Sequence, residues 1–371
     1  MSVIIPAHNA ARFLGQAIES VRAQTYTDWE ILAVDDGSSD GTWELLRAAG
    51  PGVRSLRRER AGGPAVARNL ALEHASGELV AFLDADDLLL PRYLESQLAY
   101  YEAAVRSRRE LRGRTGLQRE QAVIHHREAA VGLVTCDARI LIDEEYAPYT
   151  HLECIPDRYT PITLERLLRR NMIYVTCLVP TAVGEAVGWF DPELFGTEDF
   201  GLWIKILEAG FRAVLNEEVL AVYRRTAGSV SSNIASQGLN NRRAYALALE
   251  RGRLTPRQRR IARVAIRYNR AMEEVALMRF SRPGTGRSSP PSSGPDRSER
   301  GLVGLGGSGF DGSGLRNSSL GRFGLRVGVR RLRSLPLLLW VALGNLRMWP
   351  EWFELLRSGR AKDAAELRAH P

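Results

Sequence analysis

Three short apolar runs in the first ninety residues, separated by helix-like segments, limit the possible folds more than any other feature of this chain. The runs are Ser2–Ile5, Glu30–Val34 and Leu79–Leu83. Between them, Ala10–Gln24 and Ala65–His74 carry apolar residues at helical spacing. Strands that alternate with helices are typical of a parallel sheet covered by helices on both faces. The sequence therefore predicts an α/β fold built on a parallel or mixed sheet.

Polar, turn-forming segments follow each of these runs: Pro6–Asn9, Asp35–Asp40 and Asp84–Asp87. Ligands of open α/β sheets bind beyond the carboxyl ends of the strands. We therefore expect the three segments to converge on one ligand-binding crevice.

The acidic cluster Asp84-Ala85-Asp86-Asp87 points to a metal site. Carboxylates on one short turn repel each other unless a cation neutralises them, and a hard divalent cation prefers oxygen ligands. A solvated acidic turn is the alternative, because a bare pair of aspartates is a weak signal. The position of this cluster at the end of a buried strand favours the metal.

Two further segments suit a nucleotide. Asp36 ends the second strand and could accept hydrogen bonds from a base or a ribose, although a simple Asx-type turn would use the same residues. Gly62 and Gly63 precede a helix that contains Arg68. Backbone N–H groups and a guanidinium in this arrangement favour a diphosphate.

A second carboxylate pair, Glu198-Asp199, begins an amphipathic helix further along the chain. Such a pair could supply a general base. Acidic residues are equally favoured in a first helical turn by the helix dipole. The residues alone leave both interpretations open.

Charge and composition divide the chain. The first 230 residues carry 25 Lys+Arg and 33 Asp+Glu, whereas the remainder carries 26 and 10. An acidic first half argues against a nucleic-acid-binding core, and the basic remainder predicts an anionic partner. Residues 281–320 contain 10 Gly, 10 Ser and 4 Pro, which is typical of a flexible linker.

The segment after this linker resembles a surface helix of a peripheral membrane protein. Its uncharged run, Ser334–Leu346, is 13 residues long, shorter than the roughly 20 that span a bilayer. Arginines precede the run, and Trp349 and Trp352 follow it. This pattern favours binding to an anionic membrane surface, with packing onto the catalytic domain or a partner protein as the alternative.

The cysteines and the start of the chain indicate a compartment. Three cysteines without a CxxC pair argue against a disulfide framework and a structural zinc site. The first residues show neither a basic region nor a long apolar run of a signal peptide. We expect a cytoplasmic protein, peripheral at the inner face of the cytoplasmic membrane.

Six motifs in order carry a resemblance to a known family: SVIIPAHNA, VDDGSSDGT, GGPAVARN, AFLDADD, GWFDPELFGTEDFGLW and VYRRTAGSVS. Together they resemble family 2 glycosyltransferases, the large inverting group with the GT-A fold, over about residues 1–232. The resemblance implies transfer of a sugar from a nucleotide-diphosphate donor to a hydroxyl of a glycan or lipid-linked acceptor. Cell-surface polysaccharide or glycolipid synthesis is the expected context.

The resemblance also implies roles for single residues. Asp199, in the pair Glu198-Asp199, would be the catalytic base. Asp86 would ligate Mn²⁺ or Mg²⁺, and Asp84 would be its companion acid, near the ribose or the metal, so that both also belong to the donor site. The implied donor contacts are Pro6, Ala7, His8, Asp36, Arg68 and either Arg224 or Arg225.

We expect four parts: a GT-A domain at 1–232, a helical extension packed on it at 233–280, the linker at 281–320, and the basic, Trp-rich tail at 321–371. Thr255-Pro256 is a plausible helix start within the extension. Two alternative functions remain. A sugar-phosphate nucleotidyltransferase would normally have a glycine- and lysine-rich N-terminal loop that is missing here, and a non-catalytic membrane-associated scaffold would not need both acid clusters.

Overall fold

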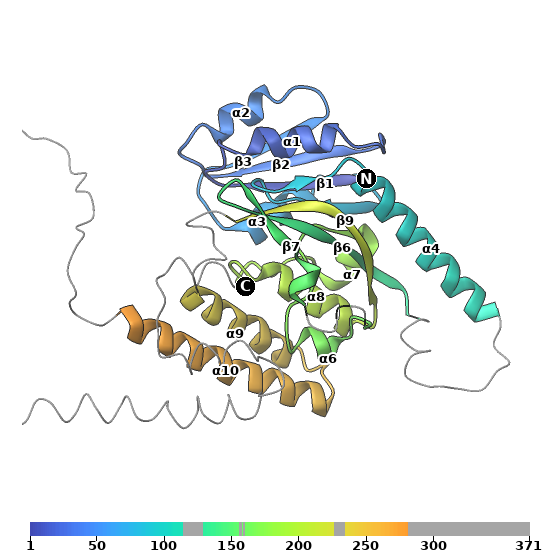
Figure 1. Cartoon of the computed structure of the whole chain (residues 1–371), viewed down its shortest axis with the longest axis vertical. Coiled ribbons are helices and arrows are strands. Elements are labelled where there is room, and N and C mark those ends of the chain that lie inside the picture. Colours follow the sequence, from blue (N-terminus) through green and yellow to red (C-terminus); the bar gives the residue numbers. More distant parts are fainter. Residues whose placement is uncertain (114–128, 156–157, 159, 226–233, 281–371) are drawn as a thin grey trace, which may run out of the picture.

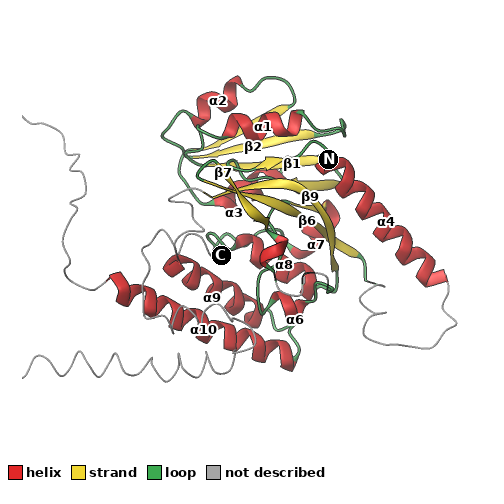
Figure 2. Ribbon diagram, viewed as in Figure 1, coloured by secondary structure: helices red, strands yellow, loops and turns green. Residues whose placement is uncertain are grey.

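A computed structural model describes residues 1–113, 129–155, 158, 160–225 and 234–280. In these residues, one nine-stranded sheet lies between two layers of helices (Figure 1; Figure 2). The expected linker and Trp-rich tail lie outside the described residues. None of the helices described is both long and apolar enough to cross a membrane.

The first half of the sheet is parallel. Its strands are β1 Ser2–Ala7, β2 Glu30–Asp36, β3 Val53–Arg58 and β4 Leu79–Phe82. The helices that connect them are α1 Leu14–Arg22, α2 Thr42–Ala48 and α3 Pro64–Leu72. Because β1 pairs in parallel with both β2 and β4, the carboxyl ends of these three strands lie at one edge of the sheet.

The second half is mixed. Its strands are β5 Leu88–Leu89, β6 Val131–Ile142, β7 Glu145–Thr150, β8 Cys177–Pro180 and β9 Arg212–Arg225. The strand order is β3-β2-β1-β4-β8-β6-β9-β5, with β7 paired to β6. β9 runs parallel to β6 and ends beside β5, which follows the acidic turn. A mixed sheet with helices on both faces confirms the predicted fold class.

Successive side chains of the buried strands point to opposite faces of the sheet and pack against the helices on each face. In β1, Ile4 packs into one hydrophobic cluster, and Val3 and Ile5 pack into the other. The first cluster also holds Phe82 and the buried Trp203 of α8 (Glu198–Glu208). The core therefore fixes the helix of the second acid pair against the strand that leads into the first.

The remaining helices complete the two layers. They are α4 Tyr93–Gly113, α6 Leu164–Leu167, α7 Thr181–Val187, α9 Ile234–Glu250 and α10 Pro256–Phe280, with a 3₁₀ turn η1 at Leu152–Cys154. α10 begins at the expected position, because Thr255 Oγ1 accepts from the Gln258 N–H at 3.3 Å and Gln258 Oε1 accepts from the Thr255 N–H at 2.8 Å. Tyr245 of α9 packs edge-on against Phe200 of α8, with ring centroids 5.3 Å apart.

Candidate active site

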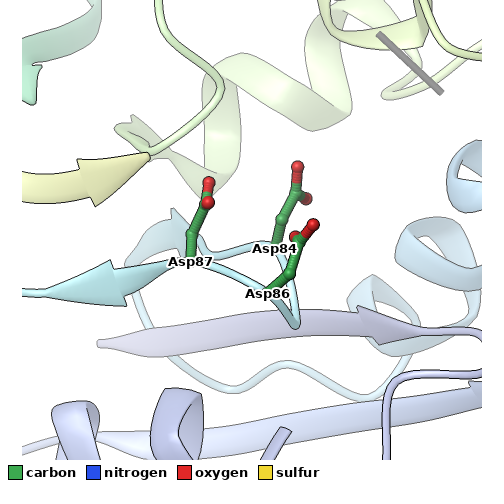
Figure 3. Close-up of side chains that lie close together, drawn as sticks. All are labelled: Asp84, Asp86 and Asp87. Carbon is green, nitrogen blue, oxygen red and sulfur yellow. The ribbon is translucent and has the colours of Figure 1, made fainter. Parts of the chain in front are cut away.

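Three aspartates meet on the turn that follows β4. One carboxylate oxygen each from Asp84, Asp86 and Asp87 lies within 4.8 Å of the others, and the side chains of Asp84 and Asp86 point the same way (Figure 3). Their repulsion is strong because the turn is partly buried. The arrangement therefore needs nearby positive charge or protons.

The Asp87 carboxylate stabilises the conformation of this turn. Its buried carboxylate accepts a hydrogen bond from the Tyr174 hydroxyl at 2.5 Å and from the Arg224 backbone N–H at 2.7 Å. Burial and the charges of Asp86 and Asp84 raise the pKa of Asp87 well above its usual range. Asp84 and Asp86 are left as the two residues that can offer oxygens to a metal ion.

Asp86 is a suitable ligand for a divalent cation. Burial, followed by repulsion from Asp84, raises the pKa of Asp86 to about 6. An adjacent divalent ion would supply the missing charge, and carboxylate oxygens are the ligands that Mg²⁺ and Mn²⁺ prefer. The donor set therefore fits a divalent metal ion.

Arg68 joins the two acid clusters. Its side chain is 2% exposed, and it donates to Asp84 Oδ1 at 2.5 Å and to Glu198 Oε1 at 2.6 Å. Its guanidinium lies 5.3 Å from the centre of the Phe190 ring. A buried cation between two carboxylates fixes the start of α8 relative to the acidic turn. The sequence interpretation placed Arg68 on a diphosphate, whereas here two of its nitrogens bind acids.

Asp199 follows Glu198 in the first turn of α8. Its pKa is raised to about 7, first by burial and then by the charge of Glu198, with Arg68 acting in the opposite direction. Glu198 is held by Arg68, whereas Asp199 is less deeply buried than Glu198. Asp199 is therefore a carboxylate that can take up a proton near neutral pH.

Asp36 closes the glycine turn before α3. Its carboxylate accepts from the Gly62 N–H at 2.9 Å and the Gly63 N–H at 2.7 Å, and it pairs with Arg58 at 2.5 Å. Gly63 has φ of +89°, a conformation that favours glycine. The sequence suggested that these two N–H groups bind a diphosphate, and in this structure both of them donate to the Asp36 carboxylate.

The other expected donor residues lie along the same edge. His8 Nδ1 donates to the Asp36 carbonyl at 2.9 Å, which joins the β1 segment containing Pro6 and Ala7 to the end of β2. Asp35 Oδ1 accepts from the Ser38 N–H at 3.0 Å. Asp35 therefore forms the Asx-type turn considered above. The carboxylate of Asp36 is free of that turn and binds the backbone of Gly62 and Gly63 instead.

Arg224 at the end of β9 completes the surroundings of the acidic turn. Its Nε donates to the Asp86 carbonyl at 2.8 Å, and its Nη2 donates to Gln16 Oε1 at 2.9 Å. Its Nη1 lies 3.4 Å from the Glu144 carboxylate, and the guanidinium lies 4.4 Å from the centre of the Phe13 ring. Arg224 is therefore braced on several elements at once.

Sequence reasoning missed Tyr174, Glu144 and Gln16 at this site. Nothing in their local sequence identifies them, because their partners are distant in the chain: Tyr174 donates to Asp87, and Glu144 and Gln16 contact Arg224 of β9. Their contacts depend on the complete fold.

Comparison with known proteins agrees with this geometry. Residues 2–108 match the family described as Glycosyl transferase family 2. TuaG of Bacillus subtilis, which carries the name of a teichuronic acid biosynthesis glycosyltransferase, is 30% identical over 237 residues, or 63% of this chain and 82% of TuaG. WfgD of Escherichia coli, named UDP-Glc:alpha-D-GlcNAc-diphosphoundecaprenol beta-1,3-glucosyltransferase, is 29% identical over 235 residues, or 63% of this chain and 80% of WfgD.

Solved structures share the fold. The mannosyltransferase PcManGT from Pyrobaculum calidifontis, in complex with GDP-Man and Mn²⁺, aligns with a TM-score of 0.51 and 22% identity over 76% of this chain and 75% of that one. S. aureus TarS 1–349 in complex with UDP-GlcNAc aligns with a TM-score of 0.51 and 18% identity over 75% and 72%. At these identities the likeness concerns the fold alone. The six motifs, the GT-A-like architecture and the extent of the match to TuaG agree: the chain belongs to glycosyltransferase family 2, the inverting GT-A group, and is a glycosyltransferase.

Proposed function

We propose that this glycosyltransferase moves a sugar from a nucleoside-diphosphate donor to a hydroxyl of a lipid-linked or glycan acceptor in the synthesis of a cell-surface glycan. One observation carries the proposal: buried Arg68 pairs with Asp84 of the acidic turn and with Glu198, the first residue of the helix that also carries Asp199. The name of WfgD supports a lipid-linked acceptor, and the name of TuaG supports a role in glycan synthesis.

In the proposed reaction, Asp199 takes the proton from the acceptor hydroxyl. The acceptor oxygen then bonds to the anomeric carbon on the face opposite the diphosphate, the bond from that carbon to the phosphate oxygen breaks, and the configuration inverts. A raised pKa of about 7 supports this role, because a base matched to neutral pH exchanges protons efficiently.

Asp84 and Asp86 would hold Mn²⁺ or Mg²⁺. When bound, the ion supplies positive charge for the departing diphosphate. Arg68 and Arg224 would add their own positive charge at the same edge. Asp36 and the segment Pro6–His8 would bind the base or the ribose, which is supported by their junction at the carboxyl ends of β1 and β2.

A panel of nucleoside diphosphates tests this proposal. We expect one of UDP, GDP, dTDP and CDP to stabilise the full chain in a thermal-shift assay, and only when Mn²⁺ or Mg²⁺ is present. Ligand at 100 times its Kd would add about 2.7 kcal/mol of stability. Equal shifts with and without metal would contradict the metal role, and no shift with any nucleotide would contradict the donor site.

We further propose that the four-part division holds and that the basic tail binds an anionic membrane surface. This proposal is supported by the arginines and tryptophans around Ser334–Leu346 alone. A chain ending at residue 280 should lose cosedimentation with vesicles containing phosphatidylglycerol, whereas the full chain should sediment with them in a salt-sensitive way. Equal sedimentation of the two chains would refute the role of the tail.

A further inference from the structure

A shallow hollow on β7 has the composition of a sugar-binding site. It has a volume of about 220 Å³ and is lined by Arg139, Tyr146, Ala147, Pro148, Tyr149 and Thr150. β7 pairs with β6 beyond the main path of the sheet (Figure 1). Nothing in the proposed reaction uses these residues.

An exposed aromatic ring dominates the hollow. Tyr146 is 55% exposed, compared with 51% for Leu239 and 48% for Phe195. The Arg139 guanidinium lies 5.6 Å from the centre of its ring, which stiffens both side chains. A rigid ring of this kind offers a large contact area at low entropic cost to the C–H face of a pyranose.

Hydrogen-bonding groups accompany the ring. The Thr150 hydroxyl is buried and has no hydrogen-bond partner among the described residues, and such groups call for an explanation in a folded protein. Arg139 is exposed and is the cross-strand partner of Thr150 in the β6–β7 pair. A hydroxyl and a guanidinium beside an aromatic face suit the hydroxyl groups of a sugar.

Both ends of β7 are connected to the acidic turn. Before the strand, Glu144 pairs with Arg224, which also holds the Asp86 carbonyl. After the strand, the His151 ring lies 5.6 Å from the ring of Tyr174, whose hydroxyl binds Asp87. A strand of six residues is about 20 Å long, so the hollow lies within a few sugar lengths of the turn.

We propose that this hollow binds a pyranose ring of the acceptor, with Tyr146 as the stacking platform and with Arg139 and Thr150 as hydrogen-bonding partners. The inference rests on the proposed function, in which a glycosyl acceptor must lie near the acidic turn while the nucleotide occupies the ends of β1 and β2. It identifies the acceptor subsite as part of the β6–β7 hairpin.

The test measures binding of a synthetic acceptor, N-acetylglucosamine linked through a diphosphate to a short alkyl chain, by calorimetry on the full chain. The metal and the nucleoside diphosphate identified by the panel are present throughout. We expect Tyr146→Ala to weaken binding on the order of tenfold, equivalent to about 1.4 kcal/mol, and Tyr146→Trp to retain it. Thr150→Val should weaken it less.

Tyr100→Ala is the matched control, since Tyr100 is 38% exposed on α4 and lies outside the hollow. It should bind the acceptor as the unchanged chain does. Nucleotide affinity should be equal in all variants. This measurement separates the acceptor subsite from the donor site, because failure of the unchanged chain to bind nucleotide would contradict the donor site and not the hollow.

Three results would overturn the subsite. The first is equal acceptor binding by Tyr146→Ala and the unchanged chain, and the second is no acceptor binding by the unchanged chain while nucleotide binds. The third is a light-scattering mass of a dimer for the unchanged chain and of a monomer for Tyr146→Ala. The last result would identify the hollow as a contact between two copies.

Discussion

Replacing Asp199 with asparagine should lower kcat by about 10²–10⁴-fold, the usual contribution of a positioned general base. Asparagine has nearly the same shape but cannot accept the proton from the acceptor hydroxyl. It also removes the repulsion between Asp199 and Glu198, so the fold and the ion pair of Arg68 with Glu198 should persist. The measurement is initial rate of transfer, with metal-dependent nucleotide affinity measured in parallel.

The pH profile makes this prediction specific. Because burial and Glu198 raise the pKa of Asp199 to about 7, the base is protonated and inactive below that pH. In the unchanged enzyme, kcat/KM should therefore rise with pH through about 7. The small residual rate of Asp199→Asn should lack this acidic limb.

Glu185→Gln on α7 provides a control, since Glu185 is an exposed acid on a neighbouring helix. It should leave both the rate and the pH profile unchanged. A residual acidic limb near pH 7 in Asp199→Asn would assign the base to another group, with Glu198 as the first candidate.

The parts of the fold that the sequence predicted are those with strong local patterns. Ser2–Ile5 and Glu30–Val34 are continuous apolar runs, because both faces of those strands are buried. β3 was missed because its sequence, VRSLRR, alternates with arginines at the edge of the sheet. β9 was missed for a different reason: its fourteen residues contain Asn216, Glu217 and Glu218 in the middle, which interrupt any apolar pattern.

The site shows the same division between local and non-local information. Asp84, Asp86 and the pair Glu198-Asp199 are visible as acid clusters at the start or end of an element. The bridge made by Arg68 is not visible, because its partners are 16 and 130 residues away. The order of the six motifs along the chain indicates that Asp84, Asp86 and Asp199 belong to one site. Only the folded structure shows that the charge of Arg68 compensates those of Asp84 and Glu198.

Replacing Asp86 with asparagine should abolish metal-dependent nucleotide binding and lower activity on the order of 10³-fold. The loss follows from a metal ion that contributes several kcal/mol of charge stabilisation, at about 1.4 kcal/mol for each factor of ten. Asp84 alone would remain to hold the ion, and it already shares its carboxylate with Arg68. Calorimetric titration of the nucleotide with Mn²⁺ measures the loss directly.

The same substitution should make the metal-free protein more stable at pH 7.5. In the folded chain the pKa of Asp86 is raised to about 6 by burial and by Asp84, so its charged form destabilises the fold above that pH. Below the ordinary aspartate value, near 4, the unchanged protein carries a proton there and this cost vanishes. The melting temperature of Asp86→Asn should therefore exceed that of the unchanged chain at pH 7.5, by about 2–4 °C for each kcal/mol recovered, and the difference should shrink as the pH falls from 6 to 4.

Asp40→Asn is the opposite control. Burial alone would raise the pKa of Asp40, but hydrogen bonds from Thr42 and Ala11 outweigh it and lower the pKa, so this substitution should destabilise the fold at pH 7.5. If Asp86→Asn also melted lower than the unchanged chain, Asp86 would be a structural acid held by the protein's own cations. A higher melting temperature combined with lost nucleotide binding would instead mean that the fold tolerates an unfavourable carboxylate because the metal ion requires it.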